Sequence, residues 1–182
     1  MIKLDNALAF IGSASGKRNI SRSMSFLLKK NIIPVFAVPR KPYTQASIEG
    51  NNSVFSKKFW NRFDFKSLKE IDDKLELFNQ SSQRYTGYKR SDKKHHNKNF
   101  IPKIYFIRQI KEISNDEKFE AFIDVLNVKL AMPKSLVNYY VLSEWNLKQE
   151  TLNIYFEKEK KQKLISKIDF KINNNSKDNF DV

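Results

Sequence analysis

Residues 39–50 read PRKPYTQASIEG, and this stretch separates two patterns of different period. Before it, residues 32–38 form a β-branched and aromatic run, which predicts a strand bounded by proline. After it, apolar residues from Ile48 to Phe63 recur along one side of a helix, for which Ser47 is a suitable N-cap. The stretch therefore predicts a strand, a loop and a helix in an α/β arrangement.

The segments on either side of this stretch extend the same arrangement. Residues 1–4 are apolar enough to end a strand, and residues 17–30 carry apolar side chains at helical spacing with a basic outer face. On the other side, Ser67 followed by Glu70 is typical of a helix start, and the helical period continues to about Asn79. We therefore expect residues 1–83 to form one α/β domain.

Residues 84–99 read RYTGYKRSDKKHHNKN and are polar, basic and nearly free of aliphatic side chains. Such a composition is typical of a linker between two domains. The sequence thus predicts that the chain continues as a second domain after this segment.

Within residues 100–173 the hydrophobic pattern changes to a period of two. The alternation is clearest in residues 104–108, 152–156 and 168–172. About five short strands in one small domain favour a twisted sheet that closes into a small β-barrel. Residues 174–182 are rich in Asn and predict a disordered tail.

The positive charge of the chain is concentrated in its first part. The 182 residues contain 34 Lys and Arg against 20 Asp and Glu, a net charge of +14. Between Asn6 and Phe63 there are 10 basic side chains and a single acid, Glu49. A surface of this kind attracts polyanions and predicts salt-dependent binding to nucleic acid. Lys outnumbers Arg 27 to 7, which an AT-rich coding bias would also produce.

The composition also excludes several classes of protein. The chain has no cysteine, which excludes disulfide scaffolds, thiolate zinc sites and cysteine catalysis. No apolar run approaches the ~18–20 residues of a membrane span, so we expect no membrane association. The apolar start is short and interrupted by Asp5 and Asn6, which argues against a secretory signal. These features predict a cytoplasmic protein.

Glu49 has two interpretations. As a carboxylate in the first turn of a helix it would be favoured by the helix dipole and by a nearby lysine. Alternatively, it would bind a divalent cation such as Mg²⁺ or Mn²⁺ in a surface otherwise suited to phosphate. Composition alone favours the first interpretation.

Two segments of the first domain resemble the second half of the catalytic core of retroviral-type integrases and bacterial insertion-sequence transposases. These segments are Asp5-Asn6-Ala7 after a strand, and the loop of residues 39–50 before a helix. The downstream FWNRF and FNQSSQRYTGYK stretches are similar to the same transposases, so that the resemblance covers about residues 1–90. It implies a partial RNase H-like core, and a role in DNA integration or transposition.

The resemblance also implies which residues would act. Asp5 and Glu49 match two of the three catalytic, metal-binding carboxylates of the family, and Mg²⁺ or Mn²⁺ is the expected cofactor. Residues near substrate DNA would be Arg40, Lys41, Tyr43, Gln45, Asn52 and Lys57. The predicted barrel is similar to the SH3-like, DNA-binding C-terminal domains of these proteins.

The chain departs from the family at its start. Ala7 stands where the family usually has glycine, and the first catalytic Asp and the three strands that surround it would precede Met1. We therefore expect the C-terminal part of a DDE-type recombinase, encoded by a truncated or split gene. It would bind DNA near the nucleoid without transferring strands alone, and its partner would be the N-terminal part or a second copy.

A non-catalytic alternative stays open. In this hypothesis the chain is a basic nucleic-acid-binding module, and Glu49 is only a helix-start acid. The two hypotheses differ in whether the carboxylates of Asp5 and Glu49 converge on one cation.

Overall fold

The computed structural model describes residues 1–13, 15–41, 46–86, 100–113 and 120–173. For residues 46–49, 83, 85 and 86 within these ranges, it describes the backbone but not the side chain. The chain divides into two compact units. Met1–Thr44 and His96–Val182 together form one of them, called the sheet unit below. Gln45–His95 form the other, called the helical unit.

The sheet unit begins with two parallel strands joined by helices. Strand β1 (Ile2–Leu4) pairs with β2 (Pro34–Phe36), and α1 (Leu8–Ile11) and α2 (Arg22–Lys29) lie between them in the chain. This order confirms the predicted strand, helix and strand. The bounds of the elements are narrower than the sequence pattern suggested, because the ends of the apolar runs lie in connecting turns.

Helix α2 has an apolar inner side and a basic outer side. The hydroxyl of Ser21 caps its start by accepting the N–H of Met24 at 3.0 Å. Met24 and Leu28 are fully buried, whereas Arg22 and Lys29 are exposed. The predicted basic outer face is therefore confirmed.

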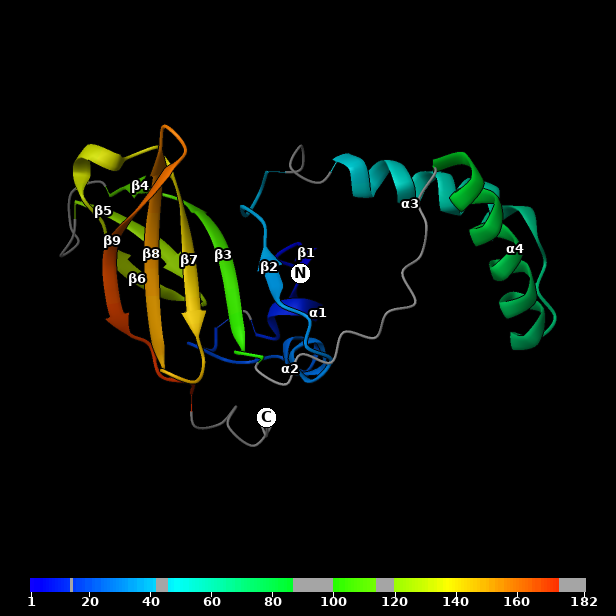
Figure 1. Cartoon of the computed structure of the whole chain (residues 1–182), viewed down its shortest axis with the longest axis horizontal. Coiled ribbons are helices and arrows are strands. Elements are labelled where there is room, and N and C mark those ends of the chain that lie inside the picture. Colours follow the sequence, from blue (N-terminus) through cyan, green and yellow to red (C-terminus); the bar gives the residue numbers. More distant parts are fainter. Residues whose placement is uncertain (14, 42–45, 87–99, 114–119, 174–182) are drawn as a thin grey trace. The chain divides into compact units, whose positions relative to one another are not determined.

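Four longer strands continue the sheet. They are β3 (Lys103–Gln109), β7 (Tyr140–Asn146), β8 (Thr151–Lys158) and β9 (Lys161–Asp169), each antiparallel to the next. Strand β3 also pairs in parallel with β2, which gives the six-stranded order β1-β2-β3-β7-β8-β9 among the described residues (Figure 1).

This mixed sheet corrects two predictions about the chain's second half. The described strands of residues 100–173 form no closed barrel; at the far end of the sheet, β9 pairs with β8 alone. Nor do residues 1–83 form one domain and residues 100–173 another, because residues 1–44 share a unit with residues 96–182. In that unit Phe36 of β2 aligns with Phe106 of β3, and their rings stack at 5.3 Å. A period of two identifies strands and their faces but says nothing about which strands pair.

A second, smaller sheet completes the core of the sheet unit. Strands β4 (Lys111–Glu112), β5 (Ala121–Val125) and β6 (Val128–Ala131) form it, and the 3₁₀ turn Lys134–Leu136 follows. Buried side chains of β5 and β6 pack in one cluster with those of α2 and of the large sheet. The largest buried side chain is Trp145, whose Nε1 donates to the carbonyl of Phe170 at 2.7 Å.

The helical unit contains α3 (Ala46–Lys58), the 3₁₀ turn Trp60–Arg62 and α4 (Leu68–Thr86). An aromatic cluster joins them, with the fully buried Phe59 at its centre. The rings that surround it are those of Phe55, Trp60, Phe63, Phe65 and Phe78.

The first turn of α4 confirms the predicted helix start. The hydroxyl of Ser67 accepts the N–H of Glu70 at 3.2 Å, and the carboxylate of Glu70 accepts the N–H of Lys66 at 3.0 Å. Helix α4 extends to Thr86, into the predicted linker. The rest of that linker, residues 87–99, and the predicted tail, residues 174–182, lie outside the described residues.

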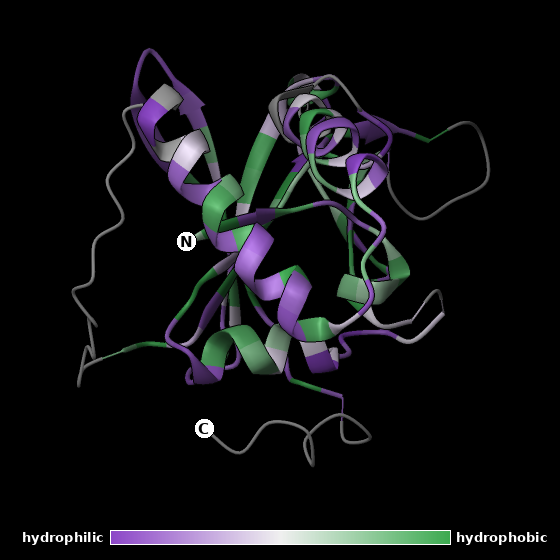
Figure 2. Ribbon diagram, turned by 90° about the vertical axis from the view of Figure 1, so that its right-hand side faces the viewer, coloured by the Kyte–Doolittle hydropathy of each residue, from purple (hydrophilic) through white to green (hydrophobic). Residues whose placement is uncertain are grey.

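In the described part of the chain, helices α2, α3 and α4 mix hydrophilic and hydrophobic residues along their length, whereas the four residues of α1 are all apolar (Figure 2). None of them combines the length and the apolar character that crossing a bilayer requires.

Candidate functional site

A pocket opens in the sheet unit where strands β1 and β2 end. Its volume is about 440 Å³. Asn6 lies two residues beyond β1, and Val38 lies two residues beyond β2. In open parallel sheets, ligands bind in the crevice outside the carboxyl ends of the strands. The position of the pocket therefore makes it the leading candidate for a binding site.

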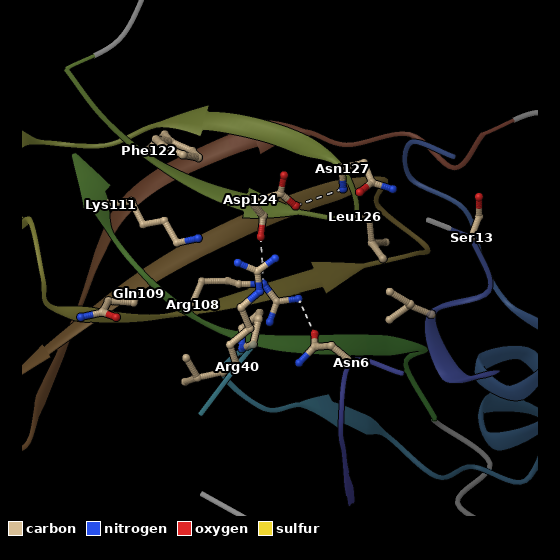
Figure 3. A pocket seen from close by; sticks show the side chains of 13 residues that line it. Asn6, Ser13, Arg40, Arg108, Gln109, Lys111, Phe122, Asp124, Leu126 and Asn127 are labelled. Carbon is tan, nitrogen blue, oxygen red and sulfur yellow. Dashed lines mark hydrogen bonds between the residues drawn. The ribbon is translucent and has the colours of Figure 1, made fainter. Parts of the chain in front are cut away.

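The lining combines polar, charged and apolar side chains from residues 6–40 and from residues 108–127 of the sheet unit. The lining residues are Asn6, Ile11, Ser13, Val38, Pro39, Arg40, Arg108, Gln109, Lys111, Phe122, Asp124, Leu126 and Asn127 (Figure 3).

Arg108 forms the floor of this pocket. Its side chain leaves β3 toward the core, and only 6% of the residue is exposed. Its Nε donates to the carbonyl of Asp124 at 2.8 Å, and Nη1 donates to the carbonyls of Ala37 and Ile107 at 3.1 and 3.0 Å. Nη2 donates to Oδ1 of Asn6 at 3.0 Å. One guanidinium thus links the ends of β1, β2 and β5.

The charge of Arg108 is poorly compensated by its surroundings. Its described hydrogen-bond partners are three backbone carbonyls and one amide oxygen, so no carboxylate oxygen among them accepts from it. Burial lowers the pKa of Arg108 to about 10, and the negative charge of Asp124 offsets this only in part. The floor of the pocket therefore carries a positive charge in a poorly hydrated environment.

Two further cations, Arg40 and Lys111, contribute to the lining and are exposed to solvent. Neither forms an ion pair with another residue in the described part of the chain. The one carboxylate of the lining belongs to Asp124, and its Oδ1 already accepts the N–H of Asn127 at 3.1 Å. Three cations against one carboxylate make the pocket electropositive.

The predicted metal ligand Asp5 lies next to the pocket rather than in its lining. It directly follows β1, as the sequence predicted. Its Oδ1 accepts the N–H of Ala7 at 3.0 Å, so part of its carboxylate stabilises the turn that leads into α1. The neighbouring Asn6 is better placed to contact a ligand in the pocket.

The other predicted metal ligand, Glu49, is the fourth residue of α3 and belongs to the helical unit. Its side chain lies outside the described residues, whereas Asp5 belongs to the sheet unit. The predicted convergence of these two carboxylates is therefore not tested.

The predicted DNA contacts fall into three groups. Arg40 lines the pocket, and Lys41 follows it in the chain. Asn52 and Lys57 are exposed on α3 of the helical unit. Tyr43 and Gln45 lie outside the described residues.

The described part of the chain contains no complete binding site for the expected Mg²⁺ or Mn²⁺. No three His, Asp or Glu side chains gather there in a metal-binding group. Asp5 is the one predicted ligand whose side chain is described, and a hard cation needs several oxygen ligands. We therefore derive no chemical step through a metal ion.

Sequence reasoning missed Arg108 and Lys111 as site residues. The alternation along β3 places Arg108 on the same side as the buried Ile104 and Phe106. A cation at an apolar position of a strand is rare unless it is paired, and this was the signal that could have identified it. Lys111 carried no comparable signal, because it is an exposed residue of the two-residue strand β4 in a chain rich in lysine.

A second polar cluster lies on the opposite face of β3, β7 and β8. The carboxylate of Glu144 accepts from the hydroxyl of Tyr105 at 2.6 Å, the amine of Lys103 at 3.0 Å and the amide of Asn153 at 3.5 Å. Burial opposes the ionised form of Glu144, but these hydrogen bonds outweigh it and lower its pKa. Burial and the bond to Glu144 raise the pKa of Tyr105. The cluster is internally paired and stabilises the sheet.

No protein-family model matches the sequence, and no curated protein matches it.

Proposed function

We propose that this chain binds DNA as part of a DDE-type transposase or integrase. One observation supports this most: a pocket with three cations opens where β1 and β2 end, beside Asp5. In the proposed relationship, Asp5 corresponds to the second catalytic carboxylate and Glu49 to the third. The basic excess of residues 6–63 and the exposed cations of α2 support contact with a phosphate backbone.

The proposed role is DNA binding, with Mg²⁺ or Mn²⁺ at Asp5 and Glu49 in the assembled enzyme. Two like-charged ions need several bridging carboxylates, and the first catalytic Asp of the family is not matched in the chain. Alone, the chain would therefore bind DNA without cutting or joining strands. Its partner would be a polypeptide with the missing carboxylate or a second copy, and its location would be the nucleoid.

DNA binding is tested by fluorescence anisotropy of a labelled duplex at increasing salt. We expect the affinity to fall linearly on a logarithmic scale as the salt concentration rises, because bound phosphates release counterions. Binding that is absent at low salt, or that does not respond to salt, would contradict the proposal.

Matched variants test where the DNA lies. Arg22→Ala with Lys29→Ala removes two exposed charges from α2, and Lys161→Ala with Lys163→Ala removes two from the edge strand β9. We expect the α2 pair to weaken binding about tenfold more. Equal losses would show that the total charge matters and that the position does not.

A non-catalytic nucleic-acid-binding module is the second candidate. The bond from the Ala7 N–H to the Asp5 carboxylate favours it, because this is an ordinary turn contact. Mn²⁺ binding distinguishes the two, measured by its paramagnetic relaxation of water. In the recombinase proposal Glu49→Gln abolishes Mn²⁺ binding and leaves DNA affinity nearly unchanged. Wild-type protein that binds no Mn²⁺ would favour the module, and efficient nicking of DNA by the chain alone would refute the proposal that it binds DNA without cutting strands.

A further inference from the structure

Three cationic side chains meet in one pocket of the sheet unit, whose lining contains a single carboxylate, that of Asp124. The charged ends of Arg40, Arg108 and Lys111 point toward the centre of this space (Figure 3). Like charges at short range repel one another, and burial strengthens the repulsion at Arg108 because water screens it less. An anion between them would remove this cost.

The number of charges suits a doubly charged anion. Three cations and the carboxylate of Asp124 leave two positive charges around the pocket. A phosphate monoester carries about −1.5 to −2 charges at neutral pH, whereas each phosphate inside a nucleic-acid strand carries one. The balance therefore favours a terminal phosphate over an internal one.

The available donors match the same ligand. Arg108 uses four of its five N–H groups in the described hydrogen bonds, so one donor is left. Arg40 adds a second guanidinium, and guanidinium groups bind phosphate oxygens in a two-pronged geometry. Lys111 adds a flexible ammonium.

The size and the apolar wall leave room for more than a phosphate. The volume of about 440 Å³ lies within the range of ~300–1,000 Å³ that is common for small-molecule sites. Val38, Phe122 and Leu126 provide apolar surface beside the cations. Such a wall suits the ring of a base or a sugar.

We propose that this pocket binds the phosphate monoester of a nucleotide, with Arg40, Arg108 and Lys111 contacting the phosphate and Phe122 lying beside the nucleoside. The nucleotide is either free or the phosphorylated end of a DNA strand. This inference deepens the proposed function, because a strand end is the part of DNA on which a recombinase acts.

The first experiment is calorimetric titration of the full chain with 5′-dAMP, deoxyadenosine and inorganic phosphate. We expect 5′-dAMP to bind about tenfold more tightly than inorganic phosphate, and deoxyadenosine not to bind detectably. Equal binding of deoxyadenosine and 5′-dAMP would overturn the proposal, because the phosphate would then contribute nothing.

The second experiment distinguishes the two sources of the phosphate. A short single-stranded oligonucleotide is compared with and without a 5′-phosphate, as a competitor of 5′-dAMP. Stronger competition by the phosphorylated strand supports a strand end as ligand. No competition by either strand, with 5′-dAMP still bound, supports the free nucleotide, whereas equally strong competition by both strands would overturn the preference for a terminal phosphate.

Matched variants locate the binding. Arg40→Ala with Lys111→Ala removes two exposed charges from the pocket, and Lys148→Ala with Lys161→Ala removes two exposed charges elsewhere in the sheet unit. We expect the pocket pair to weaken 5′-dAMP binding at least about tenfold and the control pair to leave it unchanged. Equal weakening in both pairs would overturn the proposal. These variants spare the buried Arg108, so that folding is preserved.

The two proposals can fail separately. Loss of salt-dependent DNA binding with 5′-dAMP still bound would overturn the proposed function and support the pocket. DNA binding without any 5′-dAMP binding would support the proposed function and overturn the pocket.

Discussion

The guanidinium of Arg108 donates a hydrogen bond of 3.0 Å to the amide oxygen of Asn6, a residue 102 positions earlier in the chain. The amide nitrogen of Asn6 in turn donates to the carbonyl of Ala37 at 2.7 Å. Arg108 reaches the same carbonyl at 3.1 Å. Three distant segments are thus fixed by two side chains, and the pocket described above has a stable floor.

Asn6→Ala is expected to lower the free energy of unfolding of the sheet unit by about 1–3 kcal/mol. The change removes two hydrogen bonds and leaves an N–H of the buried Arg108 without its acceptor. Urea unfolding followed by the fluorescence of Trp145, in a Trp60→Phe background, measures this. Asn79→Ala on the exposed surface of α4 is the control, and equal effects of the two changes would contradict the role of Asn6.

The two tryptophans are expected to differ in acrylamide quenching. Trp145 is fully buried and hydrogen-bonded to Phe170, whereas Trp60 is 48% exposed. Trp60→Phe should therefore leave an emission that acrylamide quenches weakly, and Trp145→Phe should leave one that it quenches strongly. Strong quenching of the Trp60→Phe protein would show that the core around Trp145 is open to solvent.

Glu144→Gln is expected to flatten the loss of stability in acid. The folded protein lowers the pKa of Glu144, so below the ordinary value of 4.5 the unfolded chain binds the proton more readily. Stability from this carboxylate is therefore present above that pH and is lost as the pH falls through its folded pKa. Urea unfolding at several pH values measures the effect.

The control for Glu144 is the exposed Glu157 on the neighbouring strand β8. Glu157→Gln should keep the wild-type dependence on pH. If both glutamine variants show the wild-type curve, the hydrogen bonds of Glu144 do not contribute to acid sensitivity.

Ser67→Ala is expected to destabilise the start of α4 by about 1 kcal/mol, because the N–H of Glu70 loses its acceptor. Amide hydrogen exchange in the first turn of α4 should become faster. Ser53→Ala, at an exposed position inside α3, should not accelerate exchange. Unchanged exchange in the Ser67 variant would mean that the hydrogen bond from the Glu70 N–H to the Ser67 hydroxyl does not stabilise the start of α4.

Local elements of the fold could be predicted from the sequence, because their signals are local. The helical spacing of Met24 and Leu28 identified α2, and Ser67 identified the start of α4. The neighbours of β3 could not be predicted in this way. Its parallel pairing with β2 depends on Phe36 meeting Phe106, and these residues are separated by the entire helical unit.

The candidate site was predictable only in part. Asp5 and Arg40 follow strands, so their position near the carboxyl ends of β1 and β2 could be expected. Arg108 enters the site from a strand of the second half, and its role depends on that strand lying beside β2. Once the second half was interpreted as a separate barrel, Arg108 could not be placed in the site.

The parallel pairing of β2 with β3 also determines when the protein can fold during its synthesis. The ribosome must complete residues 103–109 before the first two strands gain their neighbour, and β7 to β9 follow later still. The helical unit can meanwhile collapse around Phe59, since its aromatic contacts are close in the chain. Strands β1 and β2 thus stay accessible to chaperones and proteases until β3, which is encoded about 70 codons after β2, has been synthesised.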